Sequence, residues 1–431
     1  MIAPRTPLLG WAAAGIIPLA AAGLVPVAAL PCLGVFAALV AIAAVDAARG
    51  LRAASGVTVR LPVSLRCTQN CETPLAVEIG SGSFGAAIIQ IALRLPASVA
   101  SDRVSDTVTV EPGGSKILWP VTPAKRGDHR IEFADIERAS PWSLWSIRSV
   151  LPADCVLRVY PNLRGSATRA LFLRREMSGI QRQRQVGRGR EFEKLRDYLH
   201  GDSFDEISWK ATARRGKPIV KVFQVERTQE LYVAIDASRL SAREGLLEKY
   251  VTAALHLGLA AERQGDLFGI VTFSDKVHQF VRARKGKAHY RTCREAIYKL
   301  EPRRVSPDFA ELFGFIRNTL RRRALLVVLT ALDDPMLAES FAAAVPLASR
   351  RHLVLANVAQ MPGIRPLFEG PPPESTDEVY ARVAGQLFRK RLRELRIDLE
   401  RKGVRLTVLD PDKIETQLAS LYLDVKRRQT L

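Results

Sequence analysis

The longest apolar run of the chain lies near its N-terminus. No charged residue occurs from Leu8 to Val45, a stretch about twice as long as one membrane-spanning helix needs. Pro26 and Pro31 interrupt it near its midpoint and disfavour one continuous helix. The pattern therefore predicts a transmembrane helical hairpin, with helices over about 8–25 and 31–47. The alternative is a cleaved signal peptide, but such a peptide has a single, shorter apolar core.

The charges that flank this apolar run predict its orientation. Arg5 precedes the first helix, Arg49 and Arg52 follow the second, and the connecting turn carries no charge. Because loops rich in Lys and Arg stay on the cytoplasmic side, both ends of the hairpin are expected in the cytoplasm. The sequence thus predicts a bacterial inner-membrane protein whose remaining domains face the cytoplasm.

Short runs that alternate apolar and polar residues follow the hairpin. Turn residues separate them, for example Gly80-Ser81-Gly82 and Pro112-Gly113-Gly114. This spacing predicts a β-sandwich-like domain over 51–161, after the hairpin of 1–50. The expected strands are 57–63, 75–79, 87–95, 108–110, 117–121, 130–136 and 156–160. No acidic or histidine cluster occurs among them, so no active site is expected in this domain.

A basic connector is expected over 162–228, since no regular amphipathic period persists from 162 to 216. Its arginines include Arg174, Arg175, Arg182, Arg184, Arg188 and Arg190. A solvated linker beside an anionic bilayer or an acidic partner is one interpretation, and nucleic-acid binding is another. The second is disfavoured because aromatic residues are not interleaved with the arginines to stack on bases.

Apolar strands alternate with helices over the last segment, 229–431. Buried strands of this kind predict an α/β domain with a doubly wound, mostly parallel sheet, whose functional crevice lies beyond the carboxyl ends of the strands. The expected strands are 231–235, 267–273, 277–281 at an edge, 325–329, 353–358 and 404–409. The expected helices are 244–263, 289–300, 308–322, 337–350, 376–402 and 411–428.

Composition narrows the function classes only a little. Lys and Arg outnumber Asp and Glu by 64 to 44, a formal charge of +20, which suits nucleic acid, an anionic membrane or an acidic partner. The five cysteines form no CxxC pair, so neither a zinc site nor a disulfide framework is indicated, and reduced thiols are expected. The six histidines show no nucleophile–base pattern, and no GxSxG, HExxH or phosphate-loop motif occurs. Gly187-Arg188-Gly189 is only a GxG and lies in the connector, not between a strand and a helix, so it is weak evidence for nucleotide binding. No enzyme activity is expected.

One long motif carries a family resemblance. The segments Gly189–Tyr198, Gly201-Asp202 and Ile207–Arg214 resemble the signature of the bacterial domain-of-unknown-function family fifty-eight. Arg126-Gly127, Pro141–Trp145 and Val159–Pro161 are similar to landmarks of that family's β-domain. The signature residues are Gly189, Glu191, Phe192, Arg196, Tyr198, Gly201, Asp202, Trp209, Ala213 and Arg214.

The resemblance implies a membrane-anchored protein with a von Willebrand factor A-like (Rossmann-like) α/β domain and a MoxR-type AAA+ ATPase as partner. The expected function is a non-enzymatic interaction or scaffold protein that acts on a client protein, whose identity the sequence leaves open. A basic surface that binds nucleic acid or anionic lipid is the alternative.

Von Willebrand factor A domains bind Mg²⁺ through a DxSxS loop, a Thr and an Asp, and this chain departs from that pattern. Asp236 and Ser238 are present, but Leu240 stands at the second Ser position and Ala331 where the third-loop Asp is expected. A hard cation short of oxygen ligands binds poorly, so the site is interpreted as degenerate and no cofactor is expected. Nearby substitutes for the missing ligands are Ser241, Ser306, Asp308, Asp333 and Asp334. In the simpler interpretation, Asp236 and Ser238 cap the following turn and helix.

The signature itself has a structural interpretation. Trp209 is expected to be buried where the connector meets the α/β domain. The charged residues of the signature segments are expected to pair with one another. They are Glu191, Arg196, Asp197, Asp202 and Arg214.

Overall fold

The computed structural model describes residues 1–22, 29–81, 87–111, 113–163, 186–199, 204, 207–224, 229–360 and 375–428. Contacts divide the chain into two compact units, Met1–Asn162 and Leu163–Leu431.

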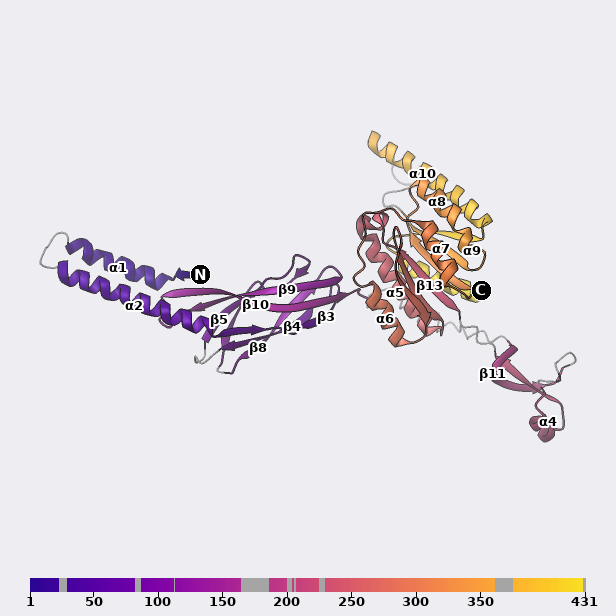
Figure 1. Cartoon of the computed structure of the whole chain (residues 1–431), viewed down its shortest axis with the longest axis horizontal. Helices are drawn as coiled ribbons and strands as arrows, with labels where there is room; N and C mark the ends of the chain where they lie inside the picture. The colour runs from indigo at the N-terminus through magenta and orange to yellow at the C-terminus, as the bar shows by residue number, and fades with distance from the viewer. Residues whose placement is uncertain are drawn as a thin grey trace. The chain divides into compact units, whose positions relative to one another are not determined.

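Two helices open the first unit, α1 (Thr6–Ala22) and α2 (Ala29–Ser55), and they lie side by side (Figure 1). The segment Leu33–Ser55 of α2 is long and apolar enough to cross a membrane, and only 11% of its most apolar window is buried. The predicted end of this helix at residue 47 is wrong. The helix continues to Ser55 because its last turns pack against the β-sheets, where Ala53 and Ala54 are buried.

Two β-sheets with one shared apolar core make up the rest of the first unit. One sheet has the order β1-β10-β9-β5-β7, with β3 paired to β10, and the other has the order β2-β4-β8-β6. Side chains from both sheets, such as Ile89 of β5 and Trp119 of β8, are fully buried in that core. The strands are β1 Ile2–Pro4, β2 Val57–Arg60, β3 Ser64–Thr68, β4 Thr73–Ser81, β5 Ala87–Leu93, β6 Val99–Ala100, β7 Asp106–Val110, β8 Ser115–Pro123, β9 Gly127–Ala139 and β10 Trp145–Tyr160.

The family signature forms a small substructure in the second unit. Strands β11 (Val186–Asp197) and β12 (Ile219–Gln224) pair antiparallel, and helix α4 (Trp209–Arg215) lies between them in sequence. The connector is therefore regular here, which corrects the expectation of an irregular linker. The prediction that Trp209 is buried is also wrong, because its side chain is 69% exposed. Smaller apolar residues, Ile207 and Ile219, fill the buried positions instead.

The α/β part of the second unit contains a six-stranded sheet with the order β15-β14-β13-β16-β17-β18. All neighbouring pairs are parallel except β14 with β15. The strands are β13 Glu230–Asp236, β14 Leu267–Phe273, β15 Val277–Arg284, β16 Ala324–Thr330, β17 Leu353–Ala359 and β18 Val404–Leu409.

Helices cover both faces of this sheet. Along β13, Val233 packs in a core with helices α5, α6 and α11, whereas Ala234 packs in a second core with α7, α8, α9 and α10. Alternate residues of a strand point to opposite faces, so the two cores lie on opposite sides. The helices are α5 Leu246–Arg263, α6 Lys287–Ile297, α7 Phe309–Thr319, α8 Pro335–Ala344, α9 Pro346–Ser349, α10 Thr376–Arg401 and α11 Ile414–Arg428, with a 3₁₀ helix, η3, over Arg239–Gly245.

Candidate functional site

The carboxyl ends of β13 and β16 bring Asp236 and Thr330 together. These strands are parallel neighbours, and Asp236 is fully buried where β13 ends. Thr330 Oγ1 donates a hydrogen bond to Asp236 Oδ2 over 2.6 Å, and the Ser238 backbone N–H donates to Oδ1 over 2.8 Å. Burial raises the pKa of the Asp236 carboxyl above its ordinary value, and the two hydrogen bonds offset only part of this rise. Both oxygens of the carboxyl are thus engaged within the protein.

The serines of the loop after β13 also bond to the backbone. Ser238 is the N-cap of η3, and its Oγ accepts from the Leu240 backbone N–H over 3.4 Å. Ser241 Oγ donates to the Asp236 carbonyl oxygen over 2.5 Å. Asp236 and Ser238 thus accept from backbone N–H groups of the turn that follows β13, whereas helix α5 begins after Gly245 with no side-chain cap.

The residues near the expected third ligand position are held in the same way. Ala331 offers only a methyl group there. Asp333 forms an ion pair with Arg243 of η3, and Asp334 caps α8 by accepting from the Met336 N–H over 3.0 Å. The guanidinium of Arg243 therefore places a positive charge beside the carboxylate of this loop.

Ser306 and Asp308 also serve the protein's own structure. Ser306 Oγ accepts from Arg239 Nε over 3.1 Å, and Asp308 caps α7 by accepting from the Glu311 N–H over 2.9 Å. Mg²⁺ demands near-octahedral oxygen coordination. Within the described ranges, no group of three or more His, Cys, Asp or Glu side chains is placed to hold a metal ion. Leu240 and Ala331 also place no side-chain oxygen at two of the expected ligand positions.

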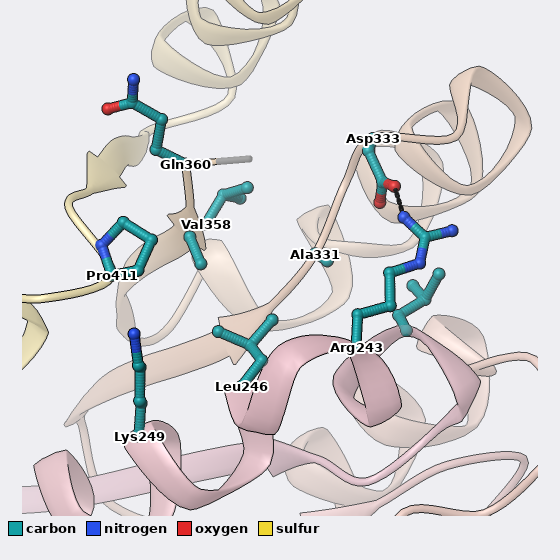
Figure 2. Close-up of a pocket in the computed structure, with 10 residues that line it drawn as sticks. Arg243, Leu246, Lys249, Ala331, Asp333, Val358, Gln360 and Pro411 are labelled. Carbon is teal, nitrogen blue, oxygen red and sulfur yellow. Dashed lines mark hydrogen bonds and ion pairs between the residues drawn. The ribbon is translucent and has the colours of Figure 1, made fainter. Parts of the chain in front are cut away.

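A cavity of about 240 Å³ opens at this edge of the sheet, beyond β16, β17 and β18 and beside the start of α5 (Figure 2). Its walls are mainly apolar. Asp333 is bonded to Arg243 through Oδ2, whereas its Oδ1 is buried and has no hydrogen-bond partner among the described residues. The lining residues are Leu240, Arg243, Leu246, Lys249, Ala331, Asp333, Val358, Ala359, Gln360 and Pro411.

A serine and a histidine meet after β14, a contact that sequence spacing did not reveal. Ser274 Oγ lies 2.6 Å from His278 Nε2 and donates to Asp275 Oδ1 over 2.6 Å. In a hydrolytic triad the carboxylate binds the other ring nitrogen, but here Asp275 Oδ1 is 3.6 Å from the same Nε2. Burial also lowers the pKa of His278. The position of Asp275 therefore differs from that of the carboxylate in a Ser-His-Asp triad.

A thiol and an imidazole also meet on α6. Cys293 Sγ lies 3.5 Å from His289 Nε2, which is itself 2.8 Å from the Phe268 carbonyl oxygen. Burial raises the pKa of the Cys293 thiol to about 12. A reactive cysteine needs its thiolate form, so this thiol is inert near neutral pH.

The described signature residues belong to the substructure of β11, α4 and β12. Gly189, Glu191 and Phe192 belong to β11, and Arg196 Nη1 donates to the Asp197 carbonyl oxygen over 3.1 Å. The ring centroids of Tyr198 and Phe204 are 6.0 Å apart, and Ala213 and Arg214 are exposed in α4. The predicted positions Gly201 and Asp202 lie outside the described residues.

Comparison with known proteins identifies the central region of the chain. Residues 194–361 match the family described as "Protein of unknown function DUF58". This match confirms the family resemblance of the signature. No curated protein matches the chain.

Solved structures with weak overall similarity include two proteins from Bacteroides. The conserved hypothetical protein BatB from Bacteroides thetaiotaomicron is 13% identical, with a TM-score of 0.30 over 47% of this chain and 100% of that one. An aerotolerance-related membrane protein from Bacteroides fragilis is 12% identical, with a TM-score of 0.29 over 46% of this chain and 99% of that one. Proximal thread matrix protein 1 from the mussel byssus is 12% identical, with a TM-score of 0.28 over 45% of this chain and 46% of that one.

Proposed function

Because residues 194–361 are a region of the DUF58 family, we propose that the chain is a membrane-anchored interaction or scaffold protein and not an enzyme. It works with a MoxR-type AAA+ ATPase, the partner that the family resemblance implies, to assemble or remodel a client protein at the bacterial inner membrane. The supporting observation is the cavity at the carboxyl edge, which has mainly apolar walls and includes the ion pair of Arg243 with Asp333. Concave, mostly apolar sites with a few polar groups bind ligands, and a side chain of the partner is the occupant that this proposal assigns to the cavity.

The finer architecture belongs to the same proposal. The strand order β15-β14-β13-β16-β17-β18 and the helices on both faces support a doubly wound, von Willebrand factor A-like domain. The exposed apolar surfaces of α1 and α2 support a transmembrane hairpin. The ion pair of Arg243 with Asp333 supports a carboxyl edge that works without Mg²⁺.

The first prediction concerns topology. Since Arg5, Arg49 and Arg52 flank the hairpin on one side, we expect the C-terminus to be cytoplasmic. A fluorescent-protein fusion at the C-terminus should fluoresce, and an alkaline phosphatase fusion there should be inactive. An active phosphatase together with a dark fluorescent protein would reverse the proposed orientation.

The second prediction tests the cavity as the docking site. Ala331→Leu adds three carbon atoms to a side chain that lines the cavity, so it should narrow the space without removing a hydrogen bond. We expect the purified, detergent-solubilised variant to capture at least tenfold less of the cognate MoxR-type ATPase than the parent chain, in the presence of ATP.

The matched control is Ala288→Leu, which makes the same change at an exposed position of α6 outside the cavity. It should capture the ATPase like the parent, and both variants should melt within a few degrees of it. If Ala331→Leu binds normally, the cavity is not the docking site. If the parent chain itself captures no ATPase, the proposed partnership fails.

A second candidate function uses the exposed cations of the signature substructure to bind nucleic acid or anionic lipid. Lys210, Arg214, Arg215 and Lys217 are all exposed there. Binding that depends on these charges weakens steeply with added salt. Binding of an apolar side chain in the cavity depends little on salt concentration. Pull-downs over a salt series therefore separate the two functions.

A further inference from the structure

The turn between β9 and β10 has a role that the proposed function does not explain. It contains Pro141-Trp142-Ser143-Leu144-Trp145, one of the landmarks of the family resemblance. Ser143 adopts a left-handed backbone conformation with φ of 58°, and its N–H donates to the Ser140 carbonyl oxygen over 2.8 Å. The Ser140 N–H in turn donates to the Trp145 carbonyl oxygen over 2.9 Å. The turn is thus closed and rigid, with its side chains in fixed positions.

This turn clasps the end of α2. Asp46 is fully buried and accepts hydrogen bonds from Ser140 Oγ over 2.5 Å and from the Trp142 N–H over 3.0 Å. The indole Nε1–H of Trp145 donates to the Ala43 carbonyl oxygen over 2.8 Å. Three donors of the turn, the Ser140 hydroxyl, the Trp142 N–H and the Trp145 indole, therefore bond to acceptors of α2.

The packing around the clasp is close. A Cβ atom at Gly50 of α2 would lie 2.3 Å from Ile147 Cδ1 and 3.1 Å from Ser140 Cβ, so a larger residue there would have to displace the Ile147 side chain. Arg138 of β9 donates to the Ala53 carbonyl oxygen over 3.1 Å. The last three turns of α2 are therefore packed against the β-sheets and do not form a free linker.

The clasp lies where the apolar surface of α2 ends. Large apolar side chains are exposed at several positions along the helix up to Val45, and Leu51 is exposed further on. Asp46, next after Val45, is the first charge after the uncharged run. Arg49 follows one turn later. The exposed apolar residues of α2 up to this point include Leu33, Val35, Val40, Ile42 and Val45.

Two groups face outward at this level. Trp142 is 47% exposed, and the guanidinium carbon of Arg49 lies 5.5 Å from the centre of its ring. Tryptophan prefers the boundary between acyl chains and headgroups, and arginine beside it binds phosphate. A cation stacked on an exposed aromatic ring at the end of an apolar helix has the composition of a lipid-headgroup contact.

We propose that the Ser140–Trp145 turn lies in the headgroup layer of the bilayer, and that Trp142 and Arg49 together hold the phosphate end of an anionic phospholipid. This inference rests on the membrane anchoring of α1 and α2. The occupant follows from continuity, because the same bilayer covers the exposed apolar residues of the uncharged run up to Val45. The clasp through Asp46 sets the depth at which the β-sheets meet the membrane.

The test uses the full chain reconstituted in vesicles of phosphatidylcholine and phosphatidylglycerol, with lipids brominated either near the carbonyls or near the ends of the acyl chains. Subtracting the emission of Trp142→Phe from that of the parent isolates Trp142 among the five tryptophans. We expect bromine near the carbonyls to quench Trp142 at least twofold more than bromine at the chain ends. Trp11 of α1, isolated in the same way with Trp11→Phe, reports on the anchor itself.

Quenching of Trp11 but not of Trp142 would overturn the headgroup contact and leave the membrane anchor intact. If neither tryptophan is quenched, the anchor fails, and the proposed function fails with it. The lipid preference is tested by native mass spectrometry of the same chain. Arg49→Gln should lose the retention of phosphatidylglycerol over phosphatidylcholine, and the control Arg66→Gln, an exposed arginine of β3 paired to the other end of β10, should keep it. Equal retention in all three chains would overturn the role of Arg49.

Discussion

Asp236→Ala should cost the second unit about 2–5 kcal/mol of unfolding free energy. The substitution leaves two donors, the Thr330 hydroxyl and the Ser238 N–H, buried without an acceptor, and each such loss costs about 1–3 kcal/mol. Thermal melts of the purified chain measure the effect. Asp236→Asn keeps an acceptor for Ser238 and should melt close to the parent, whereas Asp412→Ala, which removes an exposed carboxylate paired with Lys249, should change little.

The pH dependence of the Asp236→Asn variant gives a second readout. A raised pKa means that burial disfavours the carboxylate, so the favourable contribution of Asp236 is complete below its unfolded pKa and is lost as pH rises through its folded pKa. Asparagine does not titrate. The stability of the parent relative to Asp236→Asn should therefore fall as pH rises from acid toward neutral. A relative stability that is constant across this range would contradict the assignment of a raised pKa.

The parent chain and Asp236→Ala together also test whether the carboxyl edge binds Mg²⁺. If the carboxyl edge were an ion site, millimolar Mg²⁺ would stabilise the parent and bind to it in calorimetry, and Asp236→Ala would abolish both effects. We expect no saturable binding. Clear binding that depends on Asp236 would show that Ser241, Ser306 or Asp333 completes a coordination shell.

Asp46→Ala should destabilise the first unit by about 2–4 kcal/mol. It removes the acceptor for Ser140 Oγ and for the Trp142 N–H, in a position with no access to water. Melting of the detergent-solubilised chain, followed by near-ultraviolet circular dichroism of its tryptophans, measures the loss. Asp154→Ala is the matched control, since its carboxylate is exposed and pairs only with an exposed Arg130 among the ion pairs described for this unit.

Two melting results show whether Asp46 stabilises the first unit through its hydrogen bonds or through its negative charge. Asp46→Asn retains an acceptor oxygen and should recover most of the lost stability. If Asp46→Ala melts like Asp154→Ala, the end of α2 is held by apolar packing at Gly50 and Ala53, and the hydrogen bonds of the clasp contribute little.

Periodicity predicted the central strands of the second unit well because these strands are buried on both faces. The predicted bounds of β14 agree with the structure, and β13 and β16 differ from it by one residue at each end. The edge strand β18, in which Arg405 and Val408 are exposed, also has its predicted bounds. Ends set by single turns were less predictable. The helix expected from 244 begins at Leu246 because Ser238 first caps a 3₁₀ turn. Pro346 divides the helix expected over 337–350 into α8 and α9.

Long-range pairing explains what the sequence could not reveal. Strand β1 has only three residues and is held by β10, more than 140 positions away. The first half of β10 carries no clear alternation, yet it pairs with β9 along its length. The exposure of Trp209 has a different cause, which is the small size of the local core. A two-stranded sheet and one helix of seven residues surround this core, and Ile207 and Ile219 are small enough to fill it.

The candidate site was predictable in its position and not in its bonding. The end of β13 follows from the strand order, so Asp236 was identified from sequence. The ion pair of Arg243 with Asp333 joins residues 90 positions apart and had no local signal. The contact of Ser274 with His278 was within reach of sequence, since the two lie four residues apart across the turn into β15.

Strand β1 gives the proposed membrane anchor a mechanical property. The residues before α1 are bonded to β10 and to the turn that precedes it, with Ile2 opposite Ile147 in the sheet and the Arg5 N–H donating to the Leu144 carbonyl oxygen. The exit of α2 is bonded to the adjoining turn through Asp46. A pulling force on the β-sheets is therefore shared by α1 and α2 and does not load one helix alone. Extraction of the anchor must move both helices together, or first break the strand pairing that joins them.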